Sequence, residues 1–442
     1  MKKTIATLLL LSSMLLTLTA QTGTWSGEIT VQGTKLPLVF HLDEEHPAVD
    51  SPAQGAKGIP IQVERTATGL LNIKIPAINA TYEGMPLARQ IVGTLRQNGV
   101  SLSLTLVPGE SRLNRPQTPQ PPFPYGQEEV TFRNGDAVLK STLVLPEGYS
   151  RRTPVLIMVT GSGLQNRDEE IFEHKPFAVI ADALARAGIA TLRYDDRGFG
   201  ESVGDAVNCT TEDLKNDARS GIRLLRERFD RIGVLGHSEG GTIALMLASE
   251  GEADFIVSLA GMVVSGKETL LAQNRTAFTA AGYPATVVDT YCKLLGEAFD
   301  ARLAGTVVDS AAPFAGELPS ADGLDLPDAL KQNYQGVLVQ IASEYVRYFL
   351  ALDMRPKLSA VACPVLALNG DRDIQVDHAD NLNALRDGLP KNSANRIETV
   401  AGVNHLFQHC TTGSLAEYST IEETFAPEVL ETIVRWVLSL RE

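Results

Sequence analysis

The sequence is poor in cysteine and tryptophan and has no long cluster of basic residues. It contains 4 cysteines and 2 tryptophans in 442 residues, and its formal net charge is −14. Such an acidic chain is poorly suited to bind nucleic acid or an anionic membrane surface. The hydrophobic share of 44% and the charged share of 21% are those of an ordinary globular protein. We therefore expect a globular protein of two or three domains.

The four cysteines are widely spaced along the chain. They are Cys209, Cys292, Cys363 and Cys410. This spacing fits neither a dense disulfide scaffold nor a zinc module. Disulfides in an exported chain and buried free thiols both remain open at this point.

The sequence also lacks a recognisable cofactor or metal motif. Gly198 and Gly200 begin a glycine-rich stretch, but the third glycine, Gly204, comes one residue too late for a dinucleotide-binding fingerprint and no helix follows at once. His41 and His46 lie near acidic residues, but without the spacing of metal ligands, and a solvated strand end is the simpler interpretation. We predict neither a metal nor an organic cofactor.

Only one long apolar run is present, and it lies at the N-terminus. Lys2 and Lys3 precede an apolar run over residues 5–18, which Thr19 and Ala20 follow. An uncleaved anchor is the alternative, but the run is shorter than the roughly 20 residues of a membrane span. The pattern predicts a signal peptide over residues 1–20, a periplasmic or secreted protein, and no integral membrane span after cleavage.

Residues 21–110 show a β pattern. Short runs such as TWSGEITV and VSLSLTLV are separated by glycine, proline and asparagine, and no helical run of any length occurs. The pattern predicts an accessory β domain of unknown task, built as an antiparallel sheet, a barrel or a sandwich. Residues 111–127 are rich in proline, which cannot donate the N–H groups of a helix or sheet interior, and are the predicted linker.

From residue 128 onward, apolar runs alternate with helical segments. PVLIMVTGSG (154–163) is typical of a strand buried on both faces, and TEDLKNDARSGIRLLRERF (211–229) is an amphipathic helix. The alternation predicts a doubly wound α/β domain over residues 128–442. It stops over about 262–356, where every segment reads as helical, and we expect this insertion to form a cap over the site.

The sequence around Ser238 has the pattern of a nucleophile on a strand-to-helix turn. The apolar run RIGVLG precedes it, the run TIALMLAS follows it, and Gly236, Ser238 and Gly240 form G-x-S-x-G. A serine hydroxyl is a weak nucleophile and must be exposed beside a base, and the glycines leave room for a sharp turn. Ser238 is the predicted nucleophile.

Four parts of the sequence together resemble the α/β-hydrolase superfamily over residues 128–442. They are the Ser238 turn, TGSG (160–163), DDRGFGES (195–202), and the paired segments GDRDIQV (370–376) and GVNHLF (402–407). The similarity is nearest to bacterial exported serine carboxylesterases with G-S-G-x-x-x-R-D and a similar opening hairpin. It implies a mostly parallel sheet with a helical cap and a catalytic triad in the order serine, acid, histidine.

By this resemblance, the acid lies after the next-to-last strand, in the frame G-x-x-D-x-x-V. Gly370, Asp373 and Val376 fit that frame, so Asp373 is the predicted acid, which orients the base and stabilises its charged form. Asp371, two residues earlier, is the alternative. Otherwise, Asp371 is a turn or cap residue.

His405 follows the last strand and is the predicted general base, with His409 as the alternative. The two histidines also form an H-x-x-x-H pair. Leu406 stands where a zinc peptidase carries a glutamate, however, and the sequence indicates no third ligand. His237, beside the nucleophile, is expected to point away from the base and into packing.

The resemblance places the oxyanion hole at backbone N–H groups. One belongs to Glu239, the residue after the nucleophile, and the other to Ser162 or Gly163, between which the sequence does not decide. Arg167 and Asp168 are expected to hold loops through charge-assisted hydrogen bonds.

The sequence thus predicts an exported serine hydrolase that cleaves small-molecule carboxylic esters through an acyl-enzyme on Ser238. A serine peptidase or amidase is the alternative, although the N-terminal β block of about 90 residues is too short for the propeller of many oligopeptidases. A binding protein with a dead hydrolase domain is a further alternative, against which the complete set of nucleophile, acid and base argues. The sequence carries no signal of oligomeric state.

Overall fold

The computed structural model describes residues 22–31, 34–42, 45–54, 56–66, 69–87, 89–109, 113–305 and 318–440. Contacts divide the chain into two compact units, Met1–Leu113 and Asn114–Glu442. The predicted signal peptide, residues 1–20, lies outside the described residues. Within those residues, no helix combines the length and the apolar character that crossing a membrane requires.

The first unit is an all-β structure, as predicted. Its nine strands hydrogen-bond in the order β4-β3-β2-β1-β9-β8-β7-β6-β5, and all neighbours are antiparallel. Alternate side chains of β7 are buried, and the core gathers around Phe40 and Tyr82. The elements are β1 (Thr24–Val31), β2 (Thr34–His41), β3 (Ala48–Ser51), η1 (Pro52–Gln54), β4 (Ala56–Pro60), β5 (Gln62–Arg65), β6 (Leu71–Ile75), η2 (Pro76–Ile78), β7 (Ala80–Leu87), β8 (Gln90–Gln97) and β9 (Val100–Pro108).

The described residues of the proline-rich segment from residue 114 onward belong to the second unit. Apart from its neighbour Asn114, the guanidinium of Arg115 donates hydrogen bonds to the carbonyl oxygens of Phe172, Ser419 and Ile421 in that unit. Side-chain hydrogen bonds therefore attach this part of the segment to the second unit, in addition to the stiffness that the prolines give its backbone.

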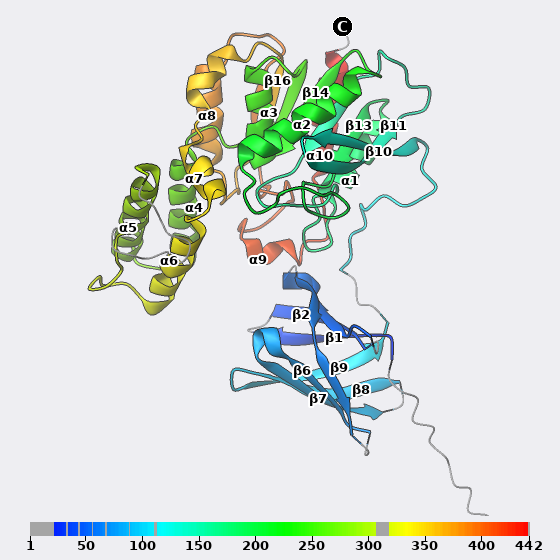
Figure 1. Ribbon diagram of the computed structural model, residues 1–442, viewed down its shortest axis with the longest axis vertical. Helices are drawn as coiled ribbons and strands as arrows, with labels where there is room; N and C mark the ends of the chain where they lie inside the picture. The colour runs from blue at the N-terminus through cyan, green and yellow to red at the C-terminus, as the bar shows by residue number, and fades with distance from the viewer. Residues whose placement is uncertain are drawn as a thin grey trace, which may run out of the picture. The chain divides into compact units, whose positions relative to one another are not determined.

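The second unit is built on a mixed sheet of eight strands. Their order is β10-β11-β13-β12-β14-β15-β16-β17. Strands β10 and β11 lie at one edge and are antiparallel to their neighbours, and all the other strands, β12 included, are parallel to one another. This is the α/β-hydrolase order, and the predicted fold class is confirmed (Figure 1). The strands are β10 (Gly126–Asn134), β11 (Ala137–Leu145), β12 (Val155–Val159), β13 (Ala190–Tyr194), β14 (Ile232–His237), β15 (Phe255–Leu259), β16 (Val365–Gly370) and β17 (Arg396–Val400).

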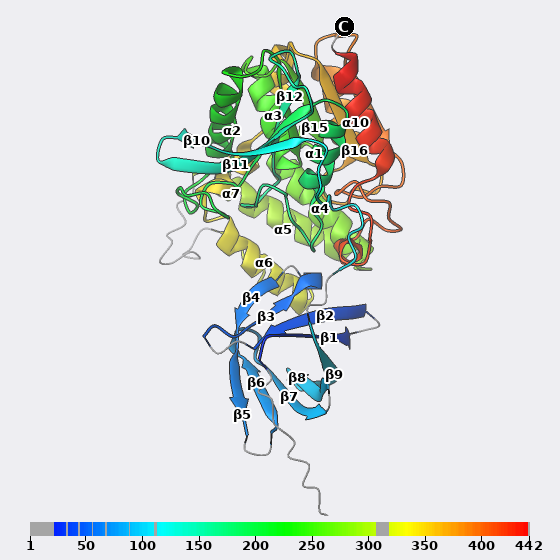
Figure 2. The same ribbon diagram turned by 90° about the vertical axis from the view of Figure 1, so that its right-hand side faces the viewer.

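Helices cover both faces of this sheet. Helices α2, α3 and α8 pack on one face, and α1 and α10 pack on the other (Figures 1 and 2). Strand β12, VLIMV, is buried along its whole length because it lies between these two layers. The helices are α1 (Pro176–Arg186), α2 (Thr211–Arg226), α3 (Glu239–Ser249), α8 (His378–Gly388), α9 (Leu415–Tyr418) and α10 (Pro427–Ser439).

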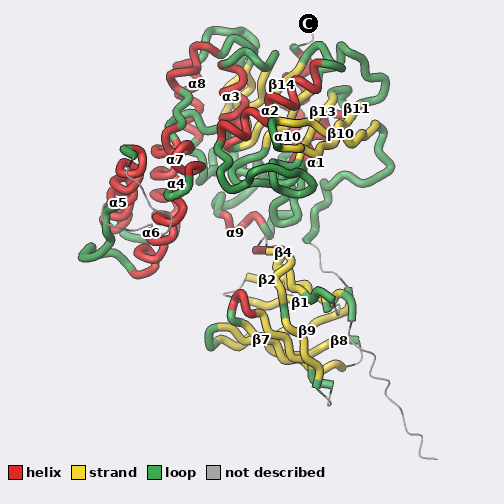
Figure 3. Tube along the Cα trace, in the orientation of Figure 1, coloured by secondary structure: helices red, strands yellow, loops and turns green. Residues whose placement is uncertain are grey.

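A group of helices is inserted between β15 and β16, which we call the cap. Figure 3 shows these helices in red, extending away from the strands of the sheet. They enclose an apolar cluster of their own around Tyr291 and Tyr334. The cap consists of α4 (Gly266–Ala280), α5 (Ala285–Leu303), α6 (Asp328–Gln340) and α7 (Glu344–Ala351), and the 3-10 helix η3 (Arg355–Ala360) leads back to the sheet.

Candidate active site

Ser238 lies on a sharp turn between strand β14 and helix α3. Its backbone has φ 54° and ψ −118°, a region that costs an L-residue strain and is held only by its surroundings. A Cβ atom on Gly236 would collide with the carbonyl oxygen of Gly240, and one on Gly240 would collide with that of Val159. The two glycines of the motif are therefore required by close backbone approach, and they leave Ser238 partly exposed among buried neighbours.

Asp373 and His405 lie on the loops that follow β16 and β17. Nδ1 of His405 is 2.7 Å from Oδ2 of Asp373, and both side chains are almost fully buried. Oδ1 of Asp373 accepts the backbone N–H groups of Gln375 at 2.7 Å and Val376 at 2.9 Å. Because the carboxylate accepts hydrogen bonds on both oxygens, Nδ1 of His405 carries a proton and Nε2 is the basic nitrogen.

Ser238 and His405 line the same cavity, which has a volume of about 270 Å³. A second cavity of about 570 Å³ lies among cap helices α4, α6 and α7, and Ser162, Phe349 and Gln375 line both. Apolar side chains form much of the second cavity: Leu270, Ala277, Phe278, Phe299, Val337, Ile341, Val346, Phe349, Ile374 and Leu415. The fold thus brings the predicted nucleophile and base together, with the predicted acid bonded to the base.

The alternative acid and base make other contacts. Asp371 accepts the backbone N–H of Gly402 at 2.7 Å, a contact that joins the loop after β16 to the loop after β17. His409 is half exposed, with its ring nitrogens 2.9 Å from Glu423 and 2.9 Å from Glu428. Among the described residues, no group of three or more histidine, cysteine, aspartate or glutamate side chains could hold a metal ion.

The loop after β12 carries the candidate oxyanion residues. The N–H of Gly161 donates to Oε1 of Glu169 at 2.8 Å, and the N–H of Gly163 faces the hydroxyl oxygen of Tyr345. Ser162 lies between these two and lines the cavity that contains Ser238. Glu239, which follows Ser238, is the first residue of α3, where the helix leaves backbone N–H groups without partners inside the helix.

The sequence analysis expected His237 to point away from the base and into packing. Its side chain is buried, but its ring lies beside that of His405, with the two ring centroids 4.7 Å apart. Nδ1 of His237 is 3.0 Å from Oε1 of Glu169, and its Nε2 is 2.9 Å from the carbonyl oxygen of His405. The prediction was wrong because a buried imidazole needs partners for both nitrogens, and two separate loops supply them here. Burial lowers the pKa of His237, but the charge of Glu169 and these hydrogen bonds outweigh it and raise the pKa above its usual value.

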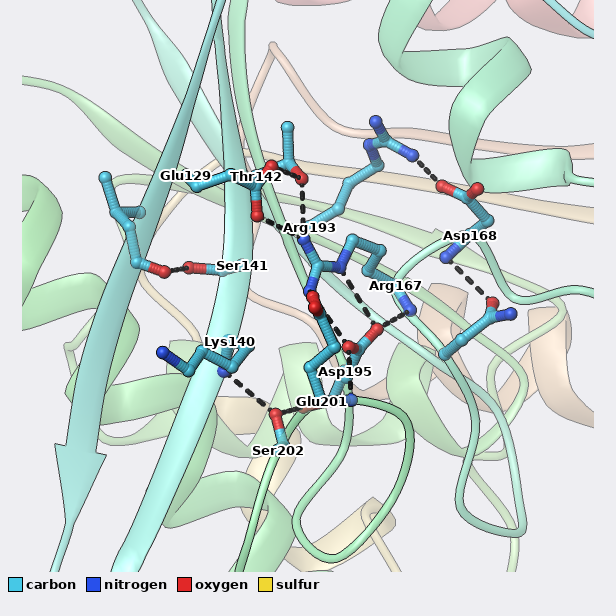
Figure 4. A network of polar contacts seen from close by, with 12 residues as sticks. Glu129, Lys140, Ser141, Thr142, Arg167, Asp168, Arg193, Asp195, Glu201 and Ser202 are labelled. Atoms are coloured by element: carbon cyan, nitrogen blue, oxygen red, sulfur yellow. Dashed lines mark hydrogen bonds and ion pairs between the residues drawn. The ribbon is translucent and has the colours of Figure 1, made fainter.

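A network of charged side chains holds the loop between β12 and α1, which carries Ser162, Gly163 and Glu169 (Figure 4). Arg167 donates to both carboxylate oxygens of Asp195, at 3.1 and 2.9 Å, and to Glu129 at 2.6 Å. Arg193 pairs with Asp168 on the same loop. These contacts are the charge-assisted hydrogen bonds expected of Arg167 and Asp168, and they fix the segment between β12 and α1 against the sheet.

Two residues of the site carry no sequence signal. Glu169 belongs to no motif, and Tyr345 lies in a cap helix whose sequence is otherwise ordinary. Both act on residues that are distant along the chain, so only the fold shows their partners.

The chain is similar to known proteins over part of its length. A family model described as serine aminopeptidase, S33, matches residues 173–295. The curated esterase EstD of Thermotoga maritima is 34% identical over 141 residues, which are 31% of this chain and 33% of that protein. The chain therefore matches only about a third of the length of that relative.

Solved structures also resemble the chain, at low identity. Est1E of Butyrivibrio proteoclasticus, solved with ferulic acid, has 17% identity and a TM-score of 0.42, covering 70% of this chain and 98% of that one. The esterase Pf2001 of Pyrococcus furiosus has 14% identity and a TM-score of 0.43, with coverages of 75% and 99%. A proline iminopeptidase of Mycobacterium smegmatis has 16% identity and a TM-score of 0.43, with coverages of 71% and 98%.

Proposed function

We propose that this protein, whose second unit has the α/β-hydrolase fold, is a serine hydrolase that cleaves carboxylic esters through an acyl-enzyme on Ser238. One observation carries the proposal. Ser238, on its strained turn, lines the same cavity as His405, whose Nδ1 is hydrogen-bonded to Asp373. A nucleophile, a base and an acid that orients the base are the elements that acyl transfer requires.

In the proposed reaction, each proton transfer passes through His405. Nε2 of His405 takes the proton of the Ser238 hydroxyl as the oxygen attacks the ester carbonyl, and Asp373 stabilises the imidazolium that forms. The same nitrogen then gives the proton to the leaving alcohol. A water molecule, activated by His405, hydrolyses the acyl-enzyme and restores the free serine.

The proposed oxyanion donors are the backbone N–H groups of Ser162 and Glu239. Of the loop after β12, the N–H of Gly161 is already bonded to Glu169 and that of Gly163 faces Tyr345, which favours Ser162. Glu239 contributes the free N–H at the start of helix α3, where the helix dipole also stabilises negative charge. Loss of one such donor typically lowers kcat by about 10²–10³-fold.

The charges around the two cavities favour an ester over a peptide with a free amino terminus. An aminopeptidase needs a carboxylate to bind the substrate ammonium. Among the described lining residues, the only carboxylate is that of Glu169, which already accepts hydrogen bonds from Gly161 and His237. An uncharged ester with an apolar group in the 570 Å³ cavity fits these surroundings better. The similarity to a protein named an esterase supports the same choice.

The proposal includes export. Its support is the N-terminal pattern alone, in which two lysines precede an apolar run and Ala20. N-terminal sequencing of the protein isolated from its native host should begin at Gln21, and a protein that retains residues 1–20 in the cytoplasm would contradict export.

A fluorophosphonate probe tests the proposed chemistry. We expect the wild type to be labelled on the peptide that contains Ser238 and to hydrolyse p-nitrophenyl esters, and Ser238→Ala to lose both properties while remaining folded. A folded wild type without labelling would refute the hydrolase. A faster turnover of peptide anilides than of aryl esters would instead favour the peptidase.

A further inference from the structure

The side chain of Glu239 is a buried carboxyl group beside the proposed oxyanion hole. The residue is 2% exposed, and its Oε2 accepts a hydrogen bond from the hydroxyl of Tyr345. Its Oε1 has no hydrogen-bond partner among the described residues. Burial raises the pKa of this carboxyl group, and the hydrogen bond from the Tyr345 hydroxyl opposes that shift only in part.

The hydroxyl of Tyr345 contacts both sides of the proposed oxyanion hole. It donates to Glu239 on helix α3 and also faces the side chain of Ser162 and the N–H of Gly163 on the loop after β12. Tyr345 itself belongs to helix α7 of the cap, and it lines the larger cavity beside Ser162. One cap side chain therefore joins the two backbone segments that supply the proposed donors.

We propose that Tyr345 is a positioning residue that sets the spacing of the oxyanion hole through Glu239 and the Ser162–Gly163 loop. Turnover then depends on the packing of the cap against these two segments. This inference rests on the proposed function. The donors act on charge that develops only in the transition state, so misplacing them lowers kcat more than it changes KM. A small displacement is enough, because hydrogen bonds to an oxyanion depend steeply on geometry.

A second tyrosine of the same helix provides a matched control. The hydroxyl of Tyr348 donates to Oε2 of Glu212 at 2.8 Å, which attaches α7 to α2. This contact is also between a cap tyrosine and a carboxylate, but it touches neither Glu239 nor the Ser162 loop. If the cap only needed attachment to the sheet domain, Tyr345→Phe and Tyr348→Phe would have equal effects.

The experiment compares four full-length variants with the wild type on p-nitrophenyl butyrate. Active sites are counted by fluorophosphonate titration, so that misfolded protein does not lower the apparent kcat. We expect Tyr345→Phe to lower kcat roughly five- to tenfold with KM changed less than about twofold, and Tyr348→Phe to stay within about twofold of the wild type. Glu239→Gln, whose amide oxygen still accepts the hydrogen bond, should lose less kcat than Glu239→Ala. Glu239→Ala should fall at least as far as Tyr345→Phe.

Three results would overturn the inference. They are an unchanged kcat in Tyr345→Phe, equal losses in the two tyrosine variants, and a Glu239→Gln variant as slow as Glu239→Ala. A folded wild type that neither reacts with the fluorophosphonate nor cleaves the ester would overturn the proposed function, and the inference with it. The wild-type measurement therefore separates the failure of the function from the failure of the positioning role.

Discussion

Oε1 of Glu169 lies 3.0 Å from Nδ1 of His237 and also accepts the N–H of Gly161 at 2.8 Å. His237 in turn donates from Nε2 to the carbonyl oxygen of His405 at 2.9 Å. A single buried carboxylate therefore connects the loop after β12, the end of strand β14 and the residue that carries the proposed base. Because both ring nitrogens of His237 face acceptors, this contact is an ion pair inside the protein.

The pair predicts a pH-dependent contribution to stability. In the pair of His237 and Glu169, the pKa of His237 lies above its usual value of 6.5, because the charge and hydrogen bonds of Glu169 outweigh the effect of burial. Such a group stabilises the fold fully below about pH 6.5, and its contribution is lost as the pH rises through the raised pKa. We expect Glu169→Gln to lower the free energy of unfolding, and the loss to be larger near about pH 6 than near about pH 9. Urea denaturation of the wild type and of Glu169→Gln at the two pH values measures this loss of unfolding free energy.

The exposed pair between His409 and Glu423 provides the control for that measurement. His409 is 51% exposed, so solvent screens the pair, and Glu423→Gln should change the free energy of unfolding by less than about 1 kcal/mol. A loss in Glu169→Gln that is the same at both pH values would contradict the predicted ionisation of His237.

The choice between the two aspartates can be tested directly. Asp373→Asn should lower kcat by about 10⁴-fold, because an amide in place of the carboxylate favours the wrong tautomer of His405. Asp371→Asn should stay within about tenfold of the wild type, because Asp371 accepts the N–H of Gly402 on the loop after β17 and an asparagine oxygen can accept the same hydrogen bond. Steady-state kinetics on one aryl ester compare the two. A larger loss in Asp371→Asn would reverse the assignment of the acid.

The fold was predictable where burial requires particular residue types at particular positions in the sequence. Strands buried on both faces, such as VLIMV and FIVSL, contain almost only apolar residues, and the strained turn at Ser238 requires glycines at fixed positions. Strands β3, β4 and β7 were not predicted as separate strands. Strands β3 and β4 have four and five residues, and β4 and β7 each contain a glycine and a proline.

The site was less predictable where contacts join distant segments. The sequence left Ser162 and Gly163 undecided, because the choice depends on where the neighbouring N–H groups point. The N–H of Gly161 contacts Glu169, 8 positions further along the chain. The N–H of Gly163 faces Tyr345, 182 positions further along. No local pattern marks such a partner, since a glutamate or tyrosine on a helix or loop is ordinary in any protein.

The turn at Ser238 predicts a large difference between two glycine substitutions. Gly236→Ala should abolish folding or cost several kcal/mol, because the new Cβ would overlap the backbone of Gly240, which has no freedom to move. Gly336→Ala should leave stability unchanged or raise it by up to about 1 kcal/mol, because Gly336 lies inside helix α6 with nothing within 4 Å of the new Cβ. Thermal unfolding of purified protein, together with soluble yield, distinguishes them. A stable and active Gly236→Ala protein would show that the turn is not as close-packed as the structure indicates.

The four cysteines, whose pairing the sequence left open, are predicted to be free thiols. All four are unpaired in the structure, and Cys209 and Cys292 are buried. Burial raises the pKa of Cys209 to about 12 and that of Cys363 to about 11, and only the thiolate reacts with disulfide reagents. We expect the native protein to react slowly with Ellman's reagent and the denatured, unreduced protein to yield four thiols per chain. Prior treatment with dithiothreitol should change neither that count nor the midpoint of thermal unfolding. A count of two or fewer that rises to four after reduction would mean that the protein forms disulfides that this fold does not contain.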